Sequence, residues 1–119
     1  MKIRIKGNSI RYRLTRSEVE RFGIDGMIKE ATHFGNKVLS YVLQKTDAEN
    51  ITASFEDDTI TLLMPQNMAT EWTLSDRVGF ENVSGELSLF IEKDFQCLDN
   101  VAEDQSDNYP NPLAVHNHE

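Results

Sequence analysis

The stretch that decides the fold is MKIRIKGNSIRYRL, residues 1–14. It predicts a β-hairpin, because Gly7 and Asn8 suit a two-residue turn of type II′, which favours glycine first. In the register that this turn sets, Arg4 lies opposite Arg11. Since successive side chains of a strand point to opposite faces, the apolar residues gather on one face and the cations on the other. The cationic face consists of Lys2, Arg4, Lys6, Arg11 and Arg13.

Like charges opposite one another destabilise a sheet, so this face requires a negative partner. One interpretation is an anionic ligand, because guanidinium groups bind phosphate or carboxylate through paired hydrogen bonds. The other is an internal salt-bridge network. Glu92 and Asp94 share the polar face of the last predicted strand, where they could neutralise two arginines. We favour the internal network and keep the five cations as candidates for anion binding.

Length and composition describe a single soluble globular domain. With 119 residues and 39% hydrophobic residues, the chain can bury one modest core without metal or disulfides. No apolar run approaches the roughly 18 residues of a membrane span, and the charged start has no hydrophobic stretch behind it, as a secretory signal would. Cys97 is the single cysteine, so no intramolecular disulfide can form. These features favour a cytoplasmic location.

Charge is distributed unevenly along the chain. Residues 1–21 carry seven cations and two acids, while the whole protein has a net charge of −8. From Glu92 onward there are seven acids and one lysine. This pattern indicates either an acidic element folded over a basic one or a bipolar surface that selects partners by its field. The acidic body argues against nucleic acid as a partner.

The remaining pattern predicts an α+β, mostly β fold. Thr15 and Glu18 have the spacing of a capping box, which predicts a helix from Arg16 to about Phe22 that ends at Gly23. We expect a curled or partly closed antiparallel sheet of about seven strands with two short helices, and no internal repeat beyond similar hairpin turns. The further strands are predicted at residues 27–34, 37–45, 51–56, 60–64 and 86–94, with a helical turn at 66–73 and a loop at 76–85.

The chain divides into a domain at residues 1–98 and an acidic tail at residues 99–119 that contains Pro and Asn. The composition of the tail would permit disorder. Tyr109 and the two Asn-linked prolines after it nevertheless suit an extended segment on the body. We expect the tail to dock up to about residue 113.

The acidic C-terminal part is also a candidate for metal binding, since magnesium and calcium prefer oxygen ligands. The spacing matches no calcium loop, and a solvated or arginine-paired stretch is the favoured interpretation over a metal or acid–base site. The candidates are Glu92, Asp94, Asp99, Asp104 and Asp107.

Few residues offer other chemistry. A lone thiol such as Cys97, between Phe95 and Leu98, is usually buried and inert. His33 is expected on a strand surface, and a zinc set of Cys97 with His116 and His118 has weak spacing. Trp72 is expected to plug the core or its rim, with pocket lining as the alternative. The pocket candidates are Trp72, Cys97 and Tyr109.

Several segments of the chain together resemble an uncharacterised family of small proteins of Bacteroidota-type bacteria. The resemblance covers essentially the whole chain. That family is a domain of unknown function, so it implies no activity, cofactor or catalytic residue. It implies a cytosolic protein in which the basic start and the acidic end belong together. The segments are MKIRIKGNSIRYRLTRSEVE (1–20), FGN (34–36), EW (71–72), RVGFEN (77–82), EKDFQCLD (92–99) and EDQSDNYPNP (103–112).

Two functions from different classes follow. We favour a non-enzymatic binding or interaction module whose cationic face is covered by acidic C-terminal residues, with an unknown protein or a small anion as partner and no cofactor. The alternative is a metal-dependent enzyme or binder for a phosphorylated small molecule, similar to the triphosphate-tunnel enzymes, with Mg²⁺ or Mn²⁺. Those enzymes open with an alternating Glu-x-Glu-x-Lys strand, whereas this chain has Lys-x-Arg-x-Lys. The analogy is therefore one of shape, which does not confer function.

Overall fold

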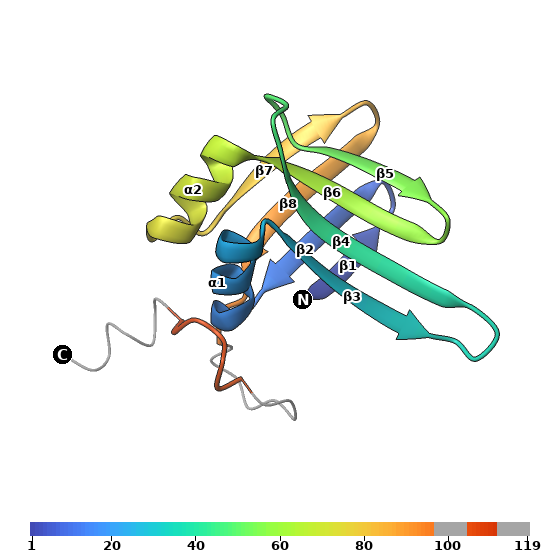
Figure 1. The fold of residues 1–119 in the computed structure, drawn as a ribbon, viewed down its shortest axis with the longest axis horizontal. Coiled ribbons are helices and arrows are strands. Elements are labelled where there is room, and N and C mark those ends of the chain that lie inside the picture. Colours follow the sequence, from blue (N-terminus) through green and yellow to red (C-terminus); the bar gives the residue numbers. More distant parts are fainter. Residues whose placement is uncertain (97–104, 112–119) are drawn as a thin grey trace.

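The computed structural model describes residues 1–96 and 105–111, which form two four-stranded β-sheets with two helices at one end (Figure 1). The predicted α+β, mostly β class is confirmed. The hairpin turns lie at the end opposite the helices. In chain order the elements are β1 (Lys2–Lys6), β2 (Ser9–Leu14), α1 (Arg16–Asp25), β3 (Met27–His33), β4 (Val38–Thr46), β5 (Thr52–Glu56), β6 (Thr59–Pro65), α2 (Gln66–Leu74), β7 (Gly79–Ser84) and β8 (Leu87–Lys93).

Both sheets are mixed and open. Sheet A has the order β1-β2-β8-β7, and sheet B has the order β3-β4-β6-β5. Each sheet joins two antiparallel hairpins through a parallel pair in its centre, β2 with β8 and β4 with β6. The prediction of one curled antiparallel sheet is therefore wrong in layout. Turn residues and alternation specify each hairpin locally, whereas the parallel pairs β2 with β8 and β4 with β6 join strands of different hairpins.

The first hairpin has the predicted register. Arg4 pairs with Arg11, and the ladder runs from Lys6 with Ser9 to Lys2 with Arg13. Gly7 has a φ of 54°, whereas Asn8 is outside the left-handed region, as a turn with glycine first requires. The residues at this turn were sufficient to predict the register, because one face of the hairpin is apolar and the other is cationic.

Two differences from the sequence prediction are larger than a shift of one residue at the end of an element. Residues 79–84 form strand β7 instead of a loop, which raises the number of strands in the described residues from seven to eight. Gly79 permits this strand, since a Cβ there would lie 2.2 Å from the Ile91 carbonyl oxygen. Helix α1 continues past Gly23 to Asp25 and is capped by Gly26, which has a φ of 76°. The predicted capping box of Thr15 and Glu18 is present.

The chain contains an internal structural repeat, so the prediction of none is wrong. Residues 2–46 form the order ββαββ, and residues 52–93 form it again. Each sheet combines the first hairpin of one half with the second hairpin of the other. The two sheets are therefore equivalent in the repeat. The central registers agree as well: Ser9 pairs with Ser88 in sheet A, and Thr59 pairs with Ser40 in sheet B.

Matching positions in the first part of each half lie fifty residues apart in the sequence. Tyr12 and Leu62 are both fully buried, as are Phe22 and Trp72. The backbone hydrogen bonds match too. The amide of Ser88 donates to the Asn8 carbonyl at 2.8 Å, and the amide of Ser40 donates to the Asp58 carbonyl at 3.0 Å. The halves share burial and register while most residue identities differ, which is why the repeat is not evident in the sequence.

The core lies between the sheets and extends between the helices. Its polar tips are hydrogen-bonded, as buried aromatic side chains require. The Tyr12 hydroxyl donates to the Ile60 carbonyl at 3.1 Å, and the Trp72 indole donates to the Val78 carbonyl at 2.9 Å. In the described part of the chain, no helix is long and apolar enough to cross a membrane.

Candidate anion-binding face

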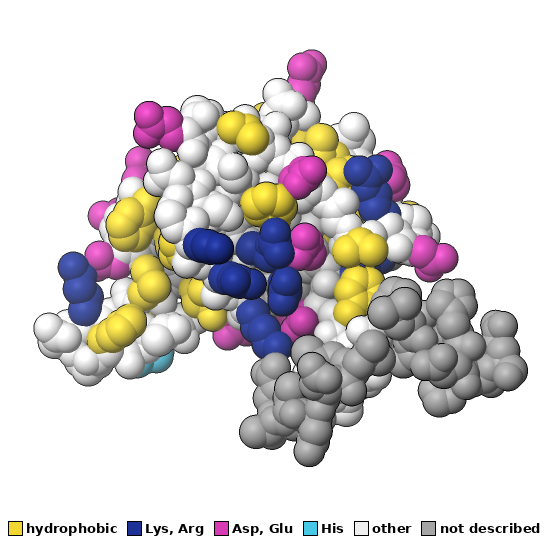
Figure 2. Space-filling view, turned by 180° about the vertical axis from the view of Figure 1, so that it is seen from behind, with side chains coloured by type: hydrophobic (Ala, Val, Ile, Leu, Met, Phe, Trp, Pro, Cys, Tyr) yellow, Lys and Arg dark blue, Asp and Glu magenta, His cyan; other side chains and the backbone are white. Residues whose placement is uncertain are grey.

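The five predicted cations lie together on the outer face of sheet A. Their strands β1 and β2 pair in a register that points all five side chains away from the core. Figure 2 shows this side of the molecule, where Lys and Arg side chains form one dense patch. We call this set the cationic face: Lys2, Arg4, Lys6, Arg11 and Arg13.

Two acidic residues at the end of β8 neutralise part of the cationic face. Glu92 lies 3.6 Å from the Arg11 guanidinium and 3.5 Å from that of Arg13. Asp94 is buried and lies 3.0 Å from the Lys2 ammonium. The register explains the position of Glu92, because β8 runs parallel to β2 and Glu92 pairs with Arg13. Glu92 therefore pairs with two arginines, as expected, whereas the cation beside Asp94 is Lys2 rather than an arginine.

The part of the cationic face nearest the turn keeps its charge. Within residues 1–96 and 105–111, no carboxylate lies within 4.0 Å of the charged group of Arg4 or Lys6. These two side chains, with Ser9 and Arg11, line a depression of about 210 Å³. The guanidinium of Arg11 also stacks on the Phe90 ring, 4.5 Å from its centroid. The depression therefore offers three cations and a hydroxyl to an anion.

Asp107 lies away from the cationic face, at the start of helix α1. Its carboxylate accepts hydrogen bonds from the Ser17 hydroxyl at 2.5 Å and from the Ser17 amide at 3.3 Å. The Ser17 bond is the main cause that lowers the pKa of this carboxyl. Asp107 thus accepts a hydrogen bond from an amide that has no partner within the helix, at the helix start, where a negative charge is favourable. The candidates Asp99, Asp104 and Cys97 lie outside the described residues.

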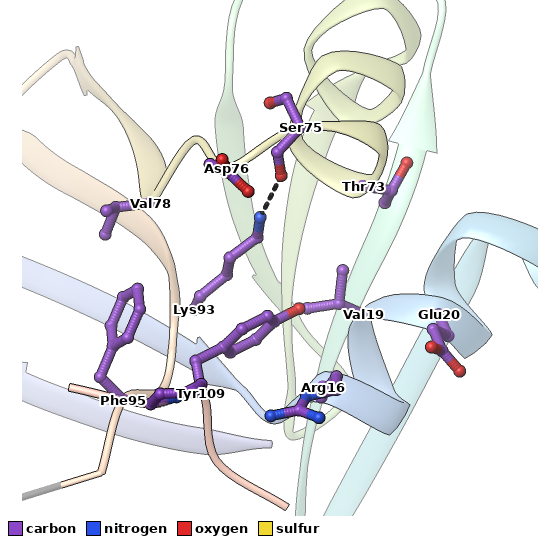
Figure 3. A pocket seen from close by; sticks show the side chains of 11 residues that line it. Arg16, Val19, Glu20, Thr73, Ser75, Asp76, Val78, Lys93, Phe95 and Tyr109 are labelled. Atoms are coloured by element: carbon purple, nitrogen blue, oxygen red, sulfur yellow. Dashed lines mark hydrogen bonds between the residues drawn. The ribbon is translucent and has the colours of Figure 1, made fainter. Parts of the chain in front are cut away.

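Residues 105–111 contact the body near the end of β8. The Tyr109 amide donates to the Asp94 carbonyl at 2.8 Å, and the Gln96 amide donates to the Tyr109 carbonyl at 2.7 Å. The Tyr109 ring packs 5.6 Å from that of Phe95, and the Arg16 guanidinium lies 5.7 Å from its centroid. Burial raises the pKa of the Tyr109 hydroxyl, which Arg16 partly opposes. Tyr109 lines a groove of about 640 Å³ between this segment and the two helices (Figure 3).

The groove contains a buried lysine, Lys93, whose ammonium donates to the Ser75 carbonyl at 2.7 Å (Figure 3). Burial lowers the pKa of Lys93, and Asp76 partly opposes the shift. Lys45 makes the matching contact in the other half, donating to the Gly23 carbonyl at 2.9 Å. Both lysine ammonium groups donate a hydrogen bond to a carbonyl at the C-terminal end of a helix, where a positive charge is favourable. The fold therefore accounts for Lys93.

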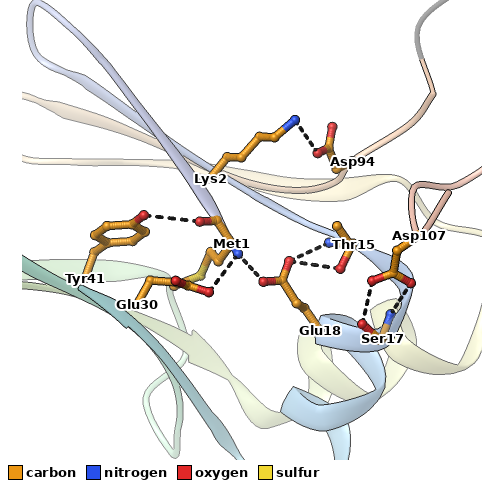
Figure 4. Close-up of polar contacts among 9 residues, drawn as sticks. All are labelled: Met1, Lys2, Thr15, Ser17, Glu18, Glu30, Tyr41, Asp94 and Asp107. Atoms are coloured by element: carbon orange, nitrogen blue, oxygen red, sulfur yellow. Dashed lines mark hydrogen bonds and ion pairs between the residues drawn. The ribbon is translucent and has the colours of Figure 1, made fainter. Parts of the chain in front are cut away.

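A second polar cluster joins β1, α1 and β3 (Figure 4). The α-ammonium group of Met1 forms ion pairs with Glu18 and, at 3.3 Å, with Glu30. Glu18 also accepts hydrogen bonds from the Thr15 amide at 2.8 Å and from the Thr15 hydroxyl at 3.0 Å. Burial opposes ionisation of Glu18, but the ammonium and the Thr15 donors outweigh it and lower its pKa. This cluster fixes the start of α1 against sheet B.

The other candidates do not converge on a second site among the described residues. Trp72 is fully buried, and His33 is exposed at the end of β3. No group of three His, Cys, Asp or Glu side chains in the described residues is placed to hold a metal ion. Sequence reasoning placed Ser9 opposite Lys6 without naming it as a candidate, and it missed Phe90, on whose ring Arg11 stacks. Alternation alone places Ser9 on the same face as Lys6, whereas Phe90 requires knowledge of the parallel pair β2 and β8.

Comparison with known proteins identifies the family. A model for a family of unknown function (DUF7009) matches residues 1–113, so the chain belongs to this family. The resemblance to a family of unknown function is thereby confirmed. Searches of curated proteins and of solved structures returned no match. The function therefore has to be inferred from the geometry of the cationic face.

Proposed function

We propose that this member of the DUF7009 family is a non-enzymatic binding module that holds an anionic partner on the cationic face. The positive charge that Glu92 and Asp94 do not neutralise supports this proposal. Among residues 1–96 and 105–111, the two carboxylates at the end of β8 form ion pairs with three of the five cations, Lys2, Arg11 and Arg13. An external anion would balance the excess around Arg4, Lys6 and Arg11.

The internal repeat carries the proposal, because it provides a second copy of the same hairpin. Hairpin β5–β6 has the register of β1–β2, shifted by fifty residues. The pair Arg4 and Arg11 corresponds to Ser54 and Thr61. The remaining cations Lys2, Lys6 and Arg13 correspond to Thr52, Glu56 and Leu63.

The core positions of the two hairpins, in contrast, remain apolar. Ile10 corresponds to Ile60, and Leu14 corresponds to Met64. The same scaffold therefore forms without cations on its outer face. Directly opposed like charges such as Arg4 and Arg11 oppose sheet formation. We infer that the cations serve a partner rather than the fold.

The shape of the face favours binding over catalysis. The depression of about 210 Å³ is smaller than ligand-binding pockets, which typically measure about 300–1,000 Å³. The described acids that could act as a base or hold a metal, Glu92 and Asp94, are paired with cations. We therefore propose an acidic protein segment as the partner, acting without a cofactor in the cytoplasm.

A phosphorylated small molecule is the second candidate, since Arg4, Lys6 and Arg11 line one depression. Under this alternative, Mg²⁺ or Mn²⁺ would accompany the ligand instead of being held by the protein alone. Adding either metal with tripolyphosphate should then strengthen binding. For an acidic protein segment, the metal should have no effect beyond screening.

The test is a titration of the protein with tripolyphosphate and with an acidic peptide at low ionic strength. The double variant Arg4→Ser/Arg11→Thr introduces the pair found at Ser54 and Thr61, and it should lose most of the binding. The matched control Lys29→Ser removes an exposed cation from sheet B and should bind like the wild type. Equal affinity of the double variant and the wild type, or no binding by the wild type, would overturn the proposal.

A further inference from the structure

We propose that the acidic partner binds as an extended strand added to the open edge of β1. This inference rests on the proposed function and specifies how the partner is held. Strand addition gives affinity through backbone hydrogen bonds and specificity through alternate side chains. The partner would carry acidic residues at alternate positions, with apolar residues between them.

The backbone of β1 offers an unpaired edge. In sheet A, β1 is the outermost strand and pairs with β2 alone among the described elements. A two-residue turn makes Lys6 and Ser9 a hydrogen-bonded pair, and such pairs alternate along an antiparallel ladder. The N–H and C=O groups of Ile3 and Ile5 therefore point outward, toward an added strand.

The cations of β1 match the spacing of a strand. Lys2, Arg4 and Lys6 occupy alternate positions on one face, so their side chains are spaced by roughly 7 Å over a length of roughly 13 Å. An acid at every second position of an added strand would face this row. The row is longer than one phosphate group, which favours an extended segment over a small anion.

The inner side of the same edge is apolar. Ile5 is 55% exposed, although its side chain lies on the core face of β1. It borders a groove of about 450 Å³ at the turn end of the two sheets, together with Phe55, which is 67% exposed. An added strand would place its apolar side chains toward Ile5, while its acids face the cations.

Protection of a sheet edge explains these charges less well. Edge strands often carry charged residues that prevent pairing with other chains. The other three edge strands each have one charged side chain on the outer face, Lys29, Glu56 and Glu81, whereas β1 has three. Arg11 and Arg13 lie on β2, which is not an edge. Cations on two neighbouring strands, one of them not an edge, fit a binding surface for a partner better than protection of one edge.

The experiment measures binding of an eight-residue peptide with alternating Glu and Val. One control peptide has the same composition with its Glu residues consecutive. The other is methylated on every second backbone nitrogen, so it keeps its charges but loses the donors toward β1. We expect the alternating peptide to bind at least about tenfold more tightly than both controls.

A variant of the protein tests the same contact from the other side. Ile5→Pro removes the outward N–H of β1 while leaving the bonds to β2. Val83→Pro is the matched control, because Val83 occupies the same position next to the turn on the opposite edge, β7. Ile5→Pro should weaken the peptide about tenfold and leave tripolyphosphate binding unchanged, and Val83→Pro should affect neither. The methylated peptide keeps the test independent of how well Ile5→Pro folds.

The outcomes separate the two proposals. Equal affinity of the alternating and methylated peptides would overturn strand addition. If Arg4→Ser/Arg11→Thr abolishes binding at the same time, the anion-binding function still holds. If neither the peptide nor tripolyphosphate binds the wild type, the proposed function itself is wrong.

Discussion

Phe22 of α1 and Trp72 of α2 meet edge to face, with their ring centroids 6.1 Å apart and their planes inclined by 68°. They occupy matching positions in the two halves of the chain, so this contact joins the helix of one half to the helix of the other. Beside them, a Cβ on Gly23 would lie 3.4 Å from the Thr73 methyl group, another pair fifty residues apart. This contact holds the two helices against the ends of both sheets.

Replacing Trp72 by Ala should destabilise the protein by about 3–5 kcal/mol, because it leaves a cavity where the two halves meet. Urea unfolding followed by circular dichroism measures this change. Leu74→Ala in the same helix is the control, since Leu74 is 82% exposed. A similar loss in both variants would contradict the placement of Trp72 in the core.

Two glycine-to-alanine substitutions should have opposite effects. Gly79→Ala places a Cβ 2.2 Å from the Ile91 carbonyl oxygen, so β7 must move away from β8 and the melting temperature should fall. Gly23→Ala lies inside α1 with ordinary contacts to Thr73, and should stabilise the helix by about 0.5–1 kcal/mol. Thermal melts of both variants check the pair. An unchanged melting temperature for Gly79→Ala would show that β7 does not approach β8 as described.

Stability should depend on the ionisation of Glu18. Its pKa in the folded protein is lowered, because the Met1 ammonium and the Thr15 donors outweigh the effect of burial. The contribution of Glu18 is therefore complete above its unfolded pKa of about 4.3, and is lost as the pH falls through the folded pKa. Glu18→Gln keeps the capping box but removes the negative charge beside the Met1 ammonium in the first turn of α1, so it should cost about 0.3–2 kcal/mol at pH 7, and the difference from wild type should shrink in acid.

Melting curves between pH 7 and pH 3 measure this dependence. Glu20→Gln on the exposed side of the same helix is the control and should parallel the wild type. A constant difference between Glu18→Gln and wild type over the whole range would contradict the role assigned to the Glu18 charge.

Much of the local structure could be predicted from the sequence. The first hairpin has its predicted register because Gly7 and the alternation around it act over a few residues. The capping box at Thr15 is equally local. Alternation along each strand places Arg13 and Glu92 on polar faces, which is why an ion pair could be expected. The strand order that brings β2 beside β8 joins residues far apart in the sequence, so it could not be predicted in the same way.

The repeat was hidden for a different physical reason. Burial constrains size and polarity rather than identity, so Tyr12 corresponds to Leu62, and Thr15 to Pro65 at the helix start. Strand β7 was missed because Gly79 has low β propensity, although its lack of a side chain is what allows close approach to β8. For the candidate site, the sequence identifies the cations, and the second hairpin shows that the fold forms without them.

The free energy of unfolding of Arg4→Ser/Arg11→Thr in urea without any ligand measures whether the cations serve a partner or the fold. If they serve a partner, we expect stability equal to or up to about 1 kcal/mol above that of the wild type at low ionic strength, because an opposed pair of like charges is removed. The gain should shrink as salt screens the wild-type charges. A loss of more than about 1 kcal/mol would contradict this expectation, since that would make the two arginines structural partners of Glu92 and its neighbours.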